Sequence, residues 1–265
     1  MNLVVENLVK KFDEKEVLKG ADYTFEKGKI YGLLGRNGAG KTTLFNCING
    51  DIDFEDGDIY IEQEGEKKNI DYSHIGYVFS TPILPEFLTG YEFLKFFTDI
   101  NKNKLNDIKT PEEYADMFDF ARSDLDRLIK EYSHGMKNKM QMICVFIENP
   151  DVILLDEPLT SLDVVAAHQM KQMLIKMKQG HIIIFSTHIL QLAKDLCDEI
   201  VLLHKGELSG VAQDVYHSAD FEEKLMYMLT SENDEAEEVK SNDMPISEQN
   251  IQQTVDENKD PYDFD

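Results

Sequence analysis

The sequence is poor in cysteine and in basic residues, and it has no long hydrophobic run. Its three cysteines, Cys47, Cys144 and Cys197, have no metal-like spacing and lie in apolar periodic segments, so we expect reduced core residues in a cytosolic protein. No uninterrupted apolar stretch approaches the length that spans a bilayer. The residues from Met1 to Glu6 lack the basic region and apolar core of a signal peptide. If the protein works at a membrane, another chain must provide the span.

Basic residues are outnumbered, 27 against 51 acidic ones among 265 residues, which gives a net charge of -24. Such a chain is a poor candidate for binding the phosphate backbone of a nucleic acid, so we expect no nucleic-acid partner. The charge is uneven, because residues 231–265 contain twelve acidic residues and two lysines. We interpret this polar, aromatic-poor stretch as a disordered tail that aids solubility. The alternatives are contact with a basic partner and a self-inhibitory plug.

The most informative segment runs from Gly35 to Thr43 and fits the phosphate-loop pattern G-x-x-x-x-G-K-[ST]. It follows an apolar run, Ile30 to Leu34, that is typical of a buried strand. Glycines let successive backbone N–H groups turn toward an anion, and the helix that starts at Lys41 directs its positive end at the same point. The Lys41 ammonium suits terminal phosphates, and the Thr42 hydroxyl is a type of ligand that Mg²⁺ takes. The segment predicts nucleotide binding.

Short apolar runs separated by helical segments predict an α/β layer architecture with the phosphate loop at a carboxyl strand end. The predicted strands are Leu3 to Leu8, Ala21 to Phe25, Ile30 to Leu34, Asp58 to Ile61, Ile75 to Val78, Val152 to Leu155, His181 to Phe185 and Ile200 to His204.

From about Leu84 the periodicity becomes helical and strand-like runs are absent, which predicts an inserted helical subdomain over about residues 84–148. Its helical segments are Tyr91 to Phe97, Pro111 to Phe120 and Ser123 to Lys130. A last amphipathic helix is predicted over Asp220 to Leu229. The chain therefore divides into a domain at 1–230 and the acidic tail at 231–265.

A second candidate site follows the apolar run Val152 to Leu155, which ends in Asp156 and Glu157. Beside a phosphate loop, Asp156 suits a position near Mg²⁺, and Glu157 could act as a general base toward the attacking water. Two acids at a strand end can also be a helix cap and a solvated side chain. His188 ends another apolar run and could bridge phosphate and water, or serve as a structural histidine.

The order of these motifs, together with Tyr132–Met136 and Ser161–Asp163, resembles the ATP-binding-cassette (ABC) family over roughly residues 1–229. The resemblance implies a P-loop NTPase core with a mostly parallel sheet, an antiparallel β subdomain and the helical insertion. It also implies ATP and Mg²⁺ as ligands.

The resemblance assigns a role to each matching position. The residues that it places around ATP are Phe12, which would stack on adenine, and the phosphate cradle Gly35, Asn37, Gly38, Ala39, Gly40, Lys41, Thr42 and Thr43. It gives Thr42 and Asp156 to Mg²⁺, Glu157 to the catalytic base and His188 to a switch beside it, and it counts Lys41 among the catalytic residues. Ser133 and Gly135 resemble the signature segment, which faces the γ-phosphate bound by the opposite subunit, and Asp163 resembles an aspartate that crosses that interface. For Phe12 the alternative is an ordinary core residue.

Two positions depart from the family pattern. The signature is usually Leu-Ser-Gly-Gly-Gln, and only Ser133 and Gly135 match it here, although the variant resembles one common in exporters of drugs, bacteriocins and lipids. After Phe79 the family usually has a glutamine that touches Mg²⁺, whereas this chain has Ser80. A serine is too short to make that contact directly, so a water would have to intervene.

The resemblance thus implies the ATPase subunit of a membrane exporter, cytoplasmic and peripheral on the inner face of the cell membrane. Two cassettes would close on ATP and drive a separate integral-membrane permease subunit, and the second cassette would be another copy or a homologue. The alternatives are a low-turnover regulatory ATP-binding module, an importer subunit, and a soluble cassette ATPase that acts on nucleic acid or ribosomes.

Overall fold

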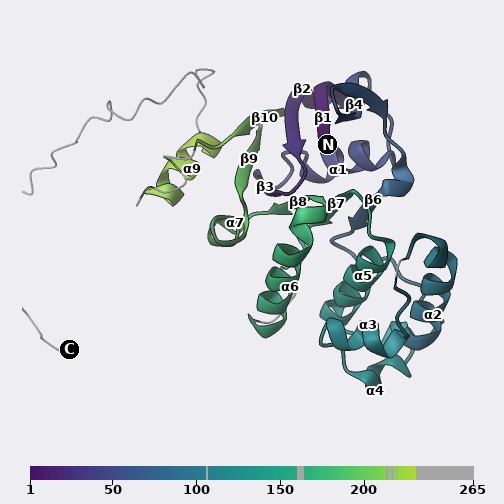
Figure 1. Ribbon diagram of the computed structural model, residues 1–265. Helices are drawn as coiled ribbons and strands as arrows, with labels where there is room; N and C mark the ends of the chain where they lie inside the picture. Colours follow the sequence, from purple (N-terminus) through teal and green to yellow (C-terminus); the bar gives the residue numbers. More distant parts are fainter. Residues whose placement is uncertain (106, 160–163, 213–214, 216–217, 219, 231–265) are drawn as a thin grey trace, which may run out of the picture. The chain divides into compact units, whose positions relative to one another are not determined.

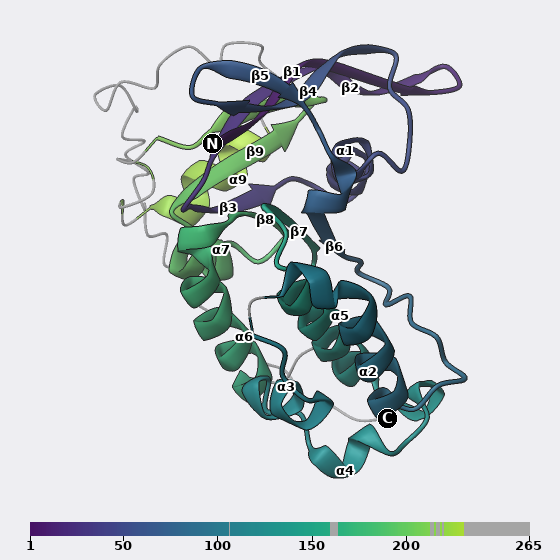
Figure 2. The ribbon, with the colours of Figure 1, turned by 45° about the vertical axis from the view of Figure 1, so that its right-hand side comes forward.

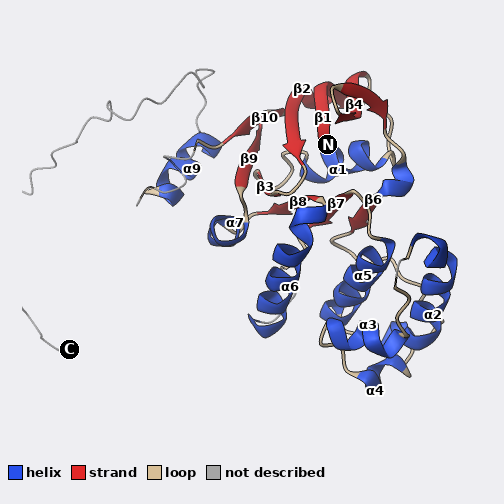
Figure 3. Cartoon of the chain, in the orientation of Figure 1, coloured by secondary structure: helices blue, strands red, loops and turns tan. Residues whose placement is uncertain are grey.

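The computed structural model describes residues 1–105, 107–159, 164–212, 215, 218 and 220–230. The chain divides into two units, Met1–Thr230 and Ser231–Asp265, and every described residue belongs to the first. The acidic tail and Asp163 therefore lie outside the described residues. Within the first unit, strands gather in one part and helices α2 to α5 form a separate group (Figures 1 and 3).

The strands are β1 Asn2–Phe12, β2 Lys15–Glu26, β3 Ile30–Leu34, β4 Asp56–Gln63, β5 Glu66–Asn69, β6 Ile75–Val78, β7 Val152–Asp156, β8 Ile182–Thr187, β9 Glu199–His204 and β10 Glu207–Gly210. The α-helices are α1 Lys41–Asn49, α2 Gly90–Asn101, α3 Pro111–Met117, α4 Arg122–Leu125, α5 His134–Glu148, α6 Val164–Met177, α7 Leu190–Leu196 and α9 Phe221–Thr230. Short 3₁₀ turns cover Tyr72–His74, Lys102–Lys104, Ile129–Glu131 and Lys178–Gly180. No helix among the described residues is both long and apolar enough to cross a membrane.

Two sheets build the unit. An antiparallel sheet has the order β2-β1-β4-β5, and a six-stranded sheet has the order β10-β9-β3-β8-β7-β6. In the second sheet the five strands from β9 to β6 are parallel, and β10 joins the edge in antiparallel register. The predicted combination of a mostly parallel sheet and an antiparallel β subdomain is confirmed.

Alternate residues of the parallel strands face two different hydrophobic clusters, as expected for a sheet covered on both faces. One cluster lies with the antiparallel sheet and α1 and includes Leu33 and Leu154. The other includes Leu34 and Leu155 and extends into α5, α6, α7 and α9 and through the helical group. Figure 2 shows β1, β2, β4 and β5 on one side of the six-stranded sheet and the long helices on the other.

The helical group contains α2 to α5, within the range 84–148. Capping explains where two of its helices begin: Thr89 and Glu92 form a capping box at α2, and Thr110 and Glu113 form another at α3, with Pro111 in the first turn. The predicted helix over Ser123 to Lys130 is wrong in extent. Only the four-residue α4 and a separate 3₁₀ turn form there. The backbone between them bonds to the start of α2 instead of continuing a helix: the Arg127 carbonyl accepts from the Gly90 N–H, and the Ile129 N–H donates to the Leu88 carbonyl.

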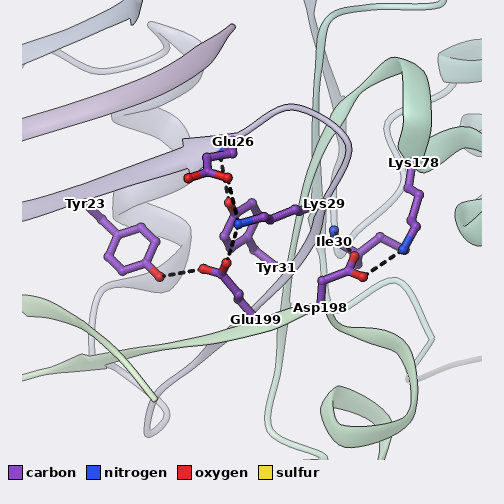
Figure 4. Close-up of polar contacts among 8 residues, drawn as sticks. All are labelled: Tyr23, Glu26, Lys29, Ile30, Tyr31, Lys178, Asp198 and Glu199. Carbon is purple, nitrogen blue, oxygen red and sulfur yellow. Dashed lines mark hydrogen bonds and ion pairs between the residues drawn. The ribbon is translucent and has the colours of Figure 1, made fainter. Parts of the chain in front are cut away.

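Polar contacts join the two sheets near the start of β3 (Figure 4). Glu199 accepts hydrogen bonds from the Tyr23 hydroxyl (3.2 Å) and the Lys29 ammonium (2.6 Å). Lys29 also pairs with Glu26 at 2.7 Å, and the Glu26 backbone N–H donates to the Tyr31 hydroxyl at 2.7 Å. These contacts anchor the amino end of β3, and the phosphate loop follows its carboxyl end.

Candidate nucleotide-binding and catalytic site

Glycines shape the loop between β3 and α1. Gly38 and Gly40 have φ of 80° and 109°, in the left-handed region that glycine adopts at little cost. Packing also requires glycine here: a Cβ on Gly40 would lie 2.8 Å from Val17 Cγ1, and one on Gly35 would lie 2.8 Å from the Leu203 carbonyl oxygen. The backbone torsions of the glycines and the packing against β2 and β9 therefore both hold the loop in the conformation that an anion cradle needs.

Lys41, the first residue of α1, is only 8% exposed. Its ammonium donates to the carbonyl oxygens of Gly35 (2.8 Å) and Arg36 (3.4 Å), so the side chain folds back onto the loop. Burial lowers the pKa of Lys41 because it disfavours the charged form, although the carboxylates of Glu157 and Asp156 oppose this shift. The negative charge of a phosphate would further favour the ammonium form of Lys41.

Asp156, the last residue of β7, is 4% exposed and lies at the centre of a hydrogen-bonded chain. Its Oδ2 accepts from the Thr42 hydroxyl at 2.8 Å, and its Oδ1 accepts from the Ser186 hydroxyl at 2.5 Å. The strand pairing places Asp156 opposite Ser186 on β8. These bonds keep the carboxylate oriented toward the start of α1.

Glu157 follows directly with φ of 48°, a strained conformation for a residue with a side chain. Its backbone N–H donates to Ser186 Oγ at 3.0 Å, which stabilises the turn out of the sheet. His188 Nδ1 lies 3.2 Å from Glu157 Oε1. Since a base held by a second polar group is a recurring catalytic arrangement, this pair can take a proton from a bound water.

Lys41, Thr42, Asp156 and Glu157 line one cleft of about 790 Å³, whereas Ser186 and the predicted site residue His188 do not line it and reach it only through their bonds to the two acids. Of the residues predicted for the site, it brings together Phe12, Asn37, Gly38, Gly40, Lys41, Thr42, Thr43, Asp156 and Glu157, and Ser80 also lines it. Phe12 is 48% exposed, so it is not the core residue that the alternative interpretation required. Its ring lies 5.2 Å from the Lys10 ammonium.

Several predicted residues do not line this cleft. Gly35 and Ala39 belong to the loop backbone, where the Ala39 N–H donates to the Arg36 carbonyl. Ser133 caps the start of α5 by accepting a hydrogen bond from the Met136 N–H at 3.2 Å, and Gly135 lies in the first turn of that helix. Asp163 is outside the described residues.

The oxygens of Thr42 and Asp156 fit a magnesium ion, which prefers hard oxygen ligands and keeps several waters or phosphate oxygens. Among the described residues no group of three histidine, cysteine or acidic side chains could hold a metal ion by itself. This donor set suits an ion that arrives with a nucleotide rather than a resident metal.

Ser186 was not predicted as a site residue, although it contacts both acids. The available signal was a small polar residue after the apolar run Ile182–Phe185, one position before the strand ends. Gln141 was missed as well: it is 6% exposed on α5 and hydrogen-bonds the backbone of Phe79, beside Ser80. Nothing in its sequence position distinguishes it from a solvent-facing helical residue.

The fold and the cleft define a P-loop nucleotide hydrolase. Residues 18–160 match the family model described as ABC transporter. The chain is 36% identical over 205 residues to an uncharacterized ABC transporter ATP-binding protein of Methanocaldococcus jannaschii, which covers 77% of this chain and 74% of the relative. It is 32% identical to the bacitracin transport ATP-binding protein BcrA of Enterococcus faecalis, over 77% of this chain and 66% of the relative.

A solved structure described as the ATP binding subunit of an ABC transporter is similar to 87% of this chain and to 100% of its own, with a TM-score of 0.73 and 27% identity. The chain therefore belongs to the ABC transporter family, as an ATP-binding and ATP-hydrolysing subunit.

Proposed function

We propose that this chain is the ATPase subunit of an ABC exporter that closes as a dimer on two Mg-ATP and drives a separate integral-membrane permease. The dimer is supported by the position of Ser133 and Gly135, which do not line the cleft of their own chain. Ser133 is exposed at the start of the 15-residue α5, where the positive end of the helix dipole favours an anion. A second copy supplies that anion as the γ-phosphate in its own cleft.

Each group of the cleft then has a role toward the nucleotide. Phe12, exposed at the rim, stacks on adenine. Backbone N–H groups from Gly35 to Thr43 cradle the phosphates, and Lys41 leaves its carbonyl partners to contact the terminal ones. Thr42 and Asp156 hold Mg²⁺, which neutralises charge on the phosphate oxygens.

Glu157 is the general base of hydrolysis. Its carboxylate takes a proton from the attacking water as the bond between the γ-phosphorus and the bridging oxygen breaks, and ADP leaves with the electron pair. His188, 3.2 Å from Glu157 Oε1, orients that carboxylate. Ser186 fixes the backbone of the base through its bond to the Glu157 N–H.

The permease contacts the surface that α2 and the segment before it present. Large apolar side chains are exposed there, with Ile83 at 73%, Phe87 at 79%, Phe96 at 57% and Ile100 at 58%. Exposed apolar groups of this size mark interaction surfaces. Export is supported by the resemblance of the Tyr132–Met136 segment to exporter signatures and by the likeness to the bacitracin transport protein.

Complementation between two inactive variants tests the dimer. Ser133→Asp keeps a good N-cap on α5 but places a negative charge against the partner's phosphate. Glu157→Gln keeps the side-chain shape but removes the base. Each variant alone is inactive. Because the two half-sites of a symmetric dimer come from different copies, an equal mixture should recover about a quarter of wild-type turnover.

Each copy carries only one of the two defects, so a mixed dimer with composite sites retains one intact site. Turnover in the mixture no greater than the mean of the two variants would refute the composite site. Purification of the full chain from native membranes tests the coupling separately: an integral-membrane subunit should co-purify, and its absence would refute a permease-driven role.

A further inference from the structure

The side chain of Gln141 pairs with the backbone just beyond the end of β6. The last register pair of that strand is Val78 with Leu155, so the Phe79 peptide groups have no further partner in the ladder. Gln141 Nε2 donates to the Phe79 carbonyl at 3.2 Å, and Gln141 Oε1 accepts from the Phe79 N–H at 3.4 Å. A carboxamide carries the same donor and acceptor as a peptide group, so the side chain replaces a strand at this point.

The pairing fixes a segment that enters the cleft. Ser80, the next residue, lines it together with Thr42, Asp156 and Glu157. From the other side, the Phe79 ring packs on Tyr77 with centroids 4.2 Å apart. Ser80 therefore follows a residue whose backbone and side chain are both held.

The same glutamine belongs to the helix that begins at the signature segment. Gln141 is eight residues after Ser133 and seven after His134, the first residue of α5, so it lies about 12 Å along the helix from its cap. Only 6% of the residue is exposed. Since a buried amide bonded through both its oxygen and its nitrogen cannot slide without losing both bonds, a shift of α5 along its axis must move Phe79 or break the pairing.

We infer that Gln141 is a positioning residue of the ATPase site, which fixes the Ser80 segment to α5 and so couples that segment to the Ser133–Gly135 segment at the start of the helix. It touches no reacting atom. This inference rests on the function proposed above, because it assigns to α5 the contact with the partner's nucleotide. When α5 moves on dimer closure, Ser80 moves with it relative to Thr42 and Asp156.

The test compares the full-length wild type with Gln141→Met, which keeps the length of the side chain and its apolar contacts but loses both bonds. We expect kcat to fall about tenfold, since the misplaced segment raises the barrier by about 1.4 kcal/mol. The affinity for Mg-ATP should stay within about twofold, because the phosphate cradle and Lys41 are untouched. Gln141→Leu provides a second variant of similar volume, and thermal melting verifies that each is folded.

Gln169→Met is the matched control. It makes the same substitution on α6, where Gln169 Nε2 donates to Asp119 Oδ2 at 2.6 Å in a contact with the helical group. Its kcat should equal that of the wild type. A double-mutant cycle with Ser80→Ala adds a readout that a purely structural role would not change: Gln141→Met should cost less than about twofold in that background, because its target is already lost.

The inference is overturned if Gln141→Met leaves kcat unchanged, lowers affinity and kcat together, or costs the full tenfold in the Ser80→Ala background. Failure of the proposed function is distinguishable. In that case the wild type itself would show no turnover of Mg-ATP, or no complementation between the Ser133 and Glu157 variants, whatever Gln141 does.

Discussion

Replacing Ser186 by alanine should destabilise the protein far more than the loss of one oxygen atom implies. Ser186 is fully buried, and its hydroxyl donates to Asp156 and accepts from the Glu157 N–H. Ser186→Ala removes a charge-assisted hydrogen bond from a buried carboxylate and leaves a backbone donor without its partner. Allowing for partial relaxation, we expect a loss of about 3 kcal/mol in the free energy of unfolding.

For a unit of this size that loss lowers the melting temperature by about 6–12 °C. Urea unfolding followed by circular dichroism measures it, and steady-state ATPase should fall at least tenfold because both acids lose their orientation. Thr98→Val is the matched control: its hydroxyl is buried and has no hydrogen-bond partner among the described residues, so its removal should cost little or stabilise. If Ser186→Ala were no more destabilising than Thr98→Val, the reasoning would be refuted.

Two further predictions concern charged and titrating groups. Lys41→Met should abolish measurable Mg-ATP binding by calorimetry without lowering the melting temperature of the nucleotide-free protein, because burial already disfavours the Lys41 ammonium; binding within tenfold of wild type would contradict this. Burial raises the pKa of Tyr31 from 10.0 to about 12, so its contribution to stability is complete below pH 10 and is lost as the pH rises from 10 to about 12. Tyr31→Phe should therefore flatten the decline in unfolding free energy over that window relative to the wild type, and parallel declines would contradict the assignment.

The features that could be predicted depend on residues close together in the sequence. Glycine spacing and an apolar run defined the loop before α1, and the conformations of Gly38 and Gly40 follow from the absence of a Cβ. The parallel strands were found because both of their faces are buried, which gives continuous apolar runs. The antiparallel strands β5 and β10 were missed. Strand β5 is exposed throughout and contains no apolar residue, and the four residues of β10 include only one large apolar residue, Leu208.

Contacts between distant residues explain what could not be predicted. Ser186 is thirty residues from Asp156, and Gln141 is 62 residues from Phe79. A serine in a strand and a glutamine in a helix each have many possible partners, so their roles depend on which strands and helices become neighbours. The sequence likewise did not predict whether Phe12 is buried or exposed, because an aromatic residue at a strand end suits both a core and a cleft.

The sequence by itself determined that a phosphate cradle forms, because glycine torsions, a strand and the start of a helix are set by residues within one short segment. It also determined that two acids end a buried strand. Only the tertiary structure decided that Thr42, Asp156 and Ser186 share one hydrogen-bonded chain and that α5 is tied to the edge of the cleft. The physical reason is that hydrogen bonds act over about 3 Å, so distant residues acquire these partners only when strand order and helix packing bring them together.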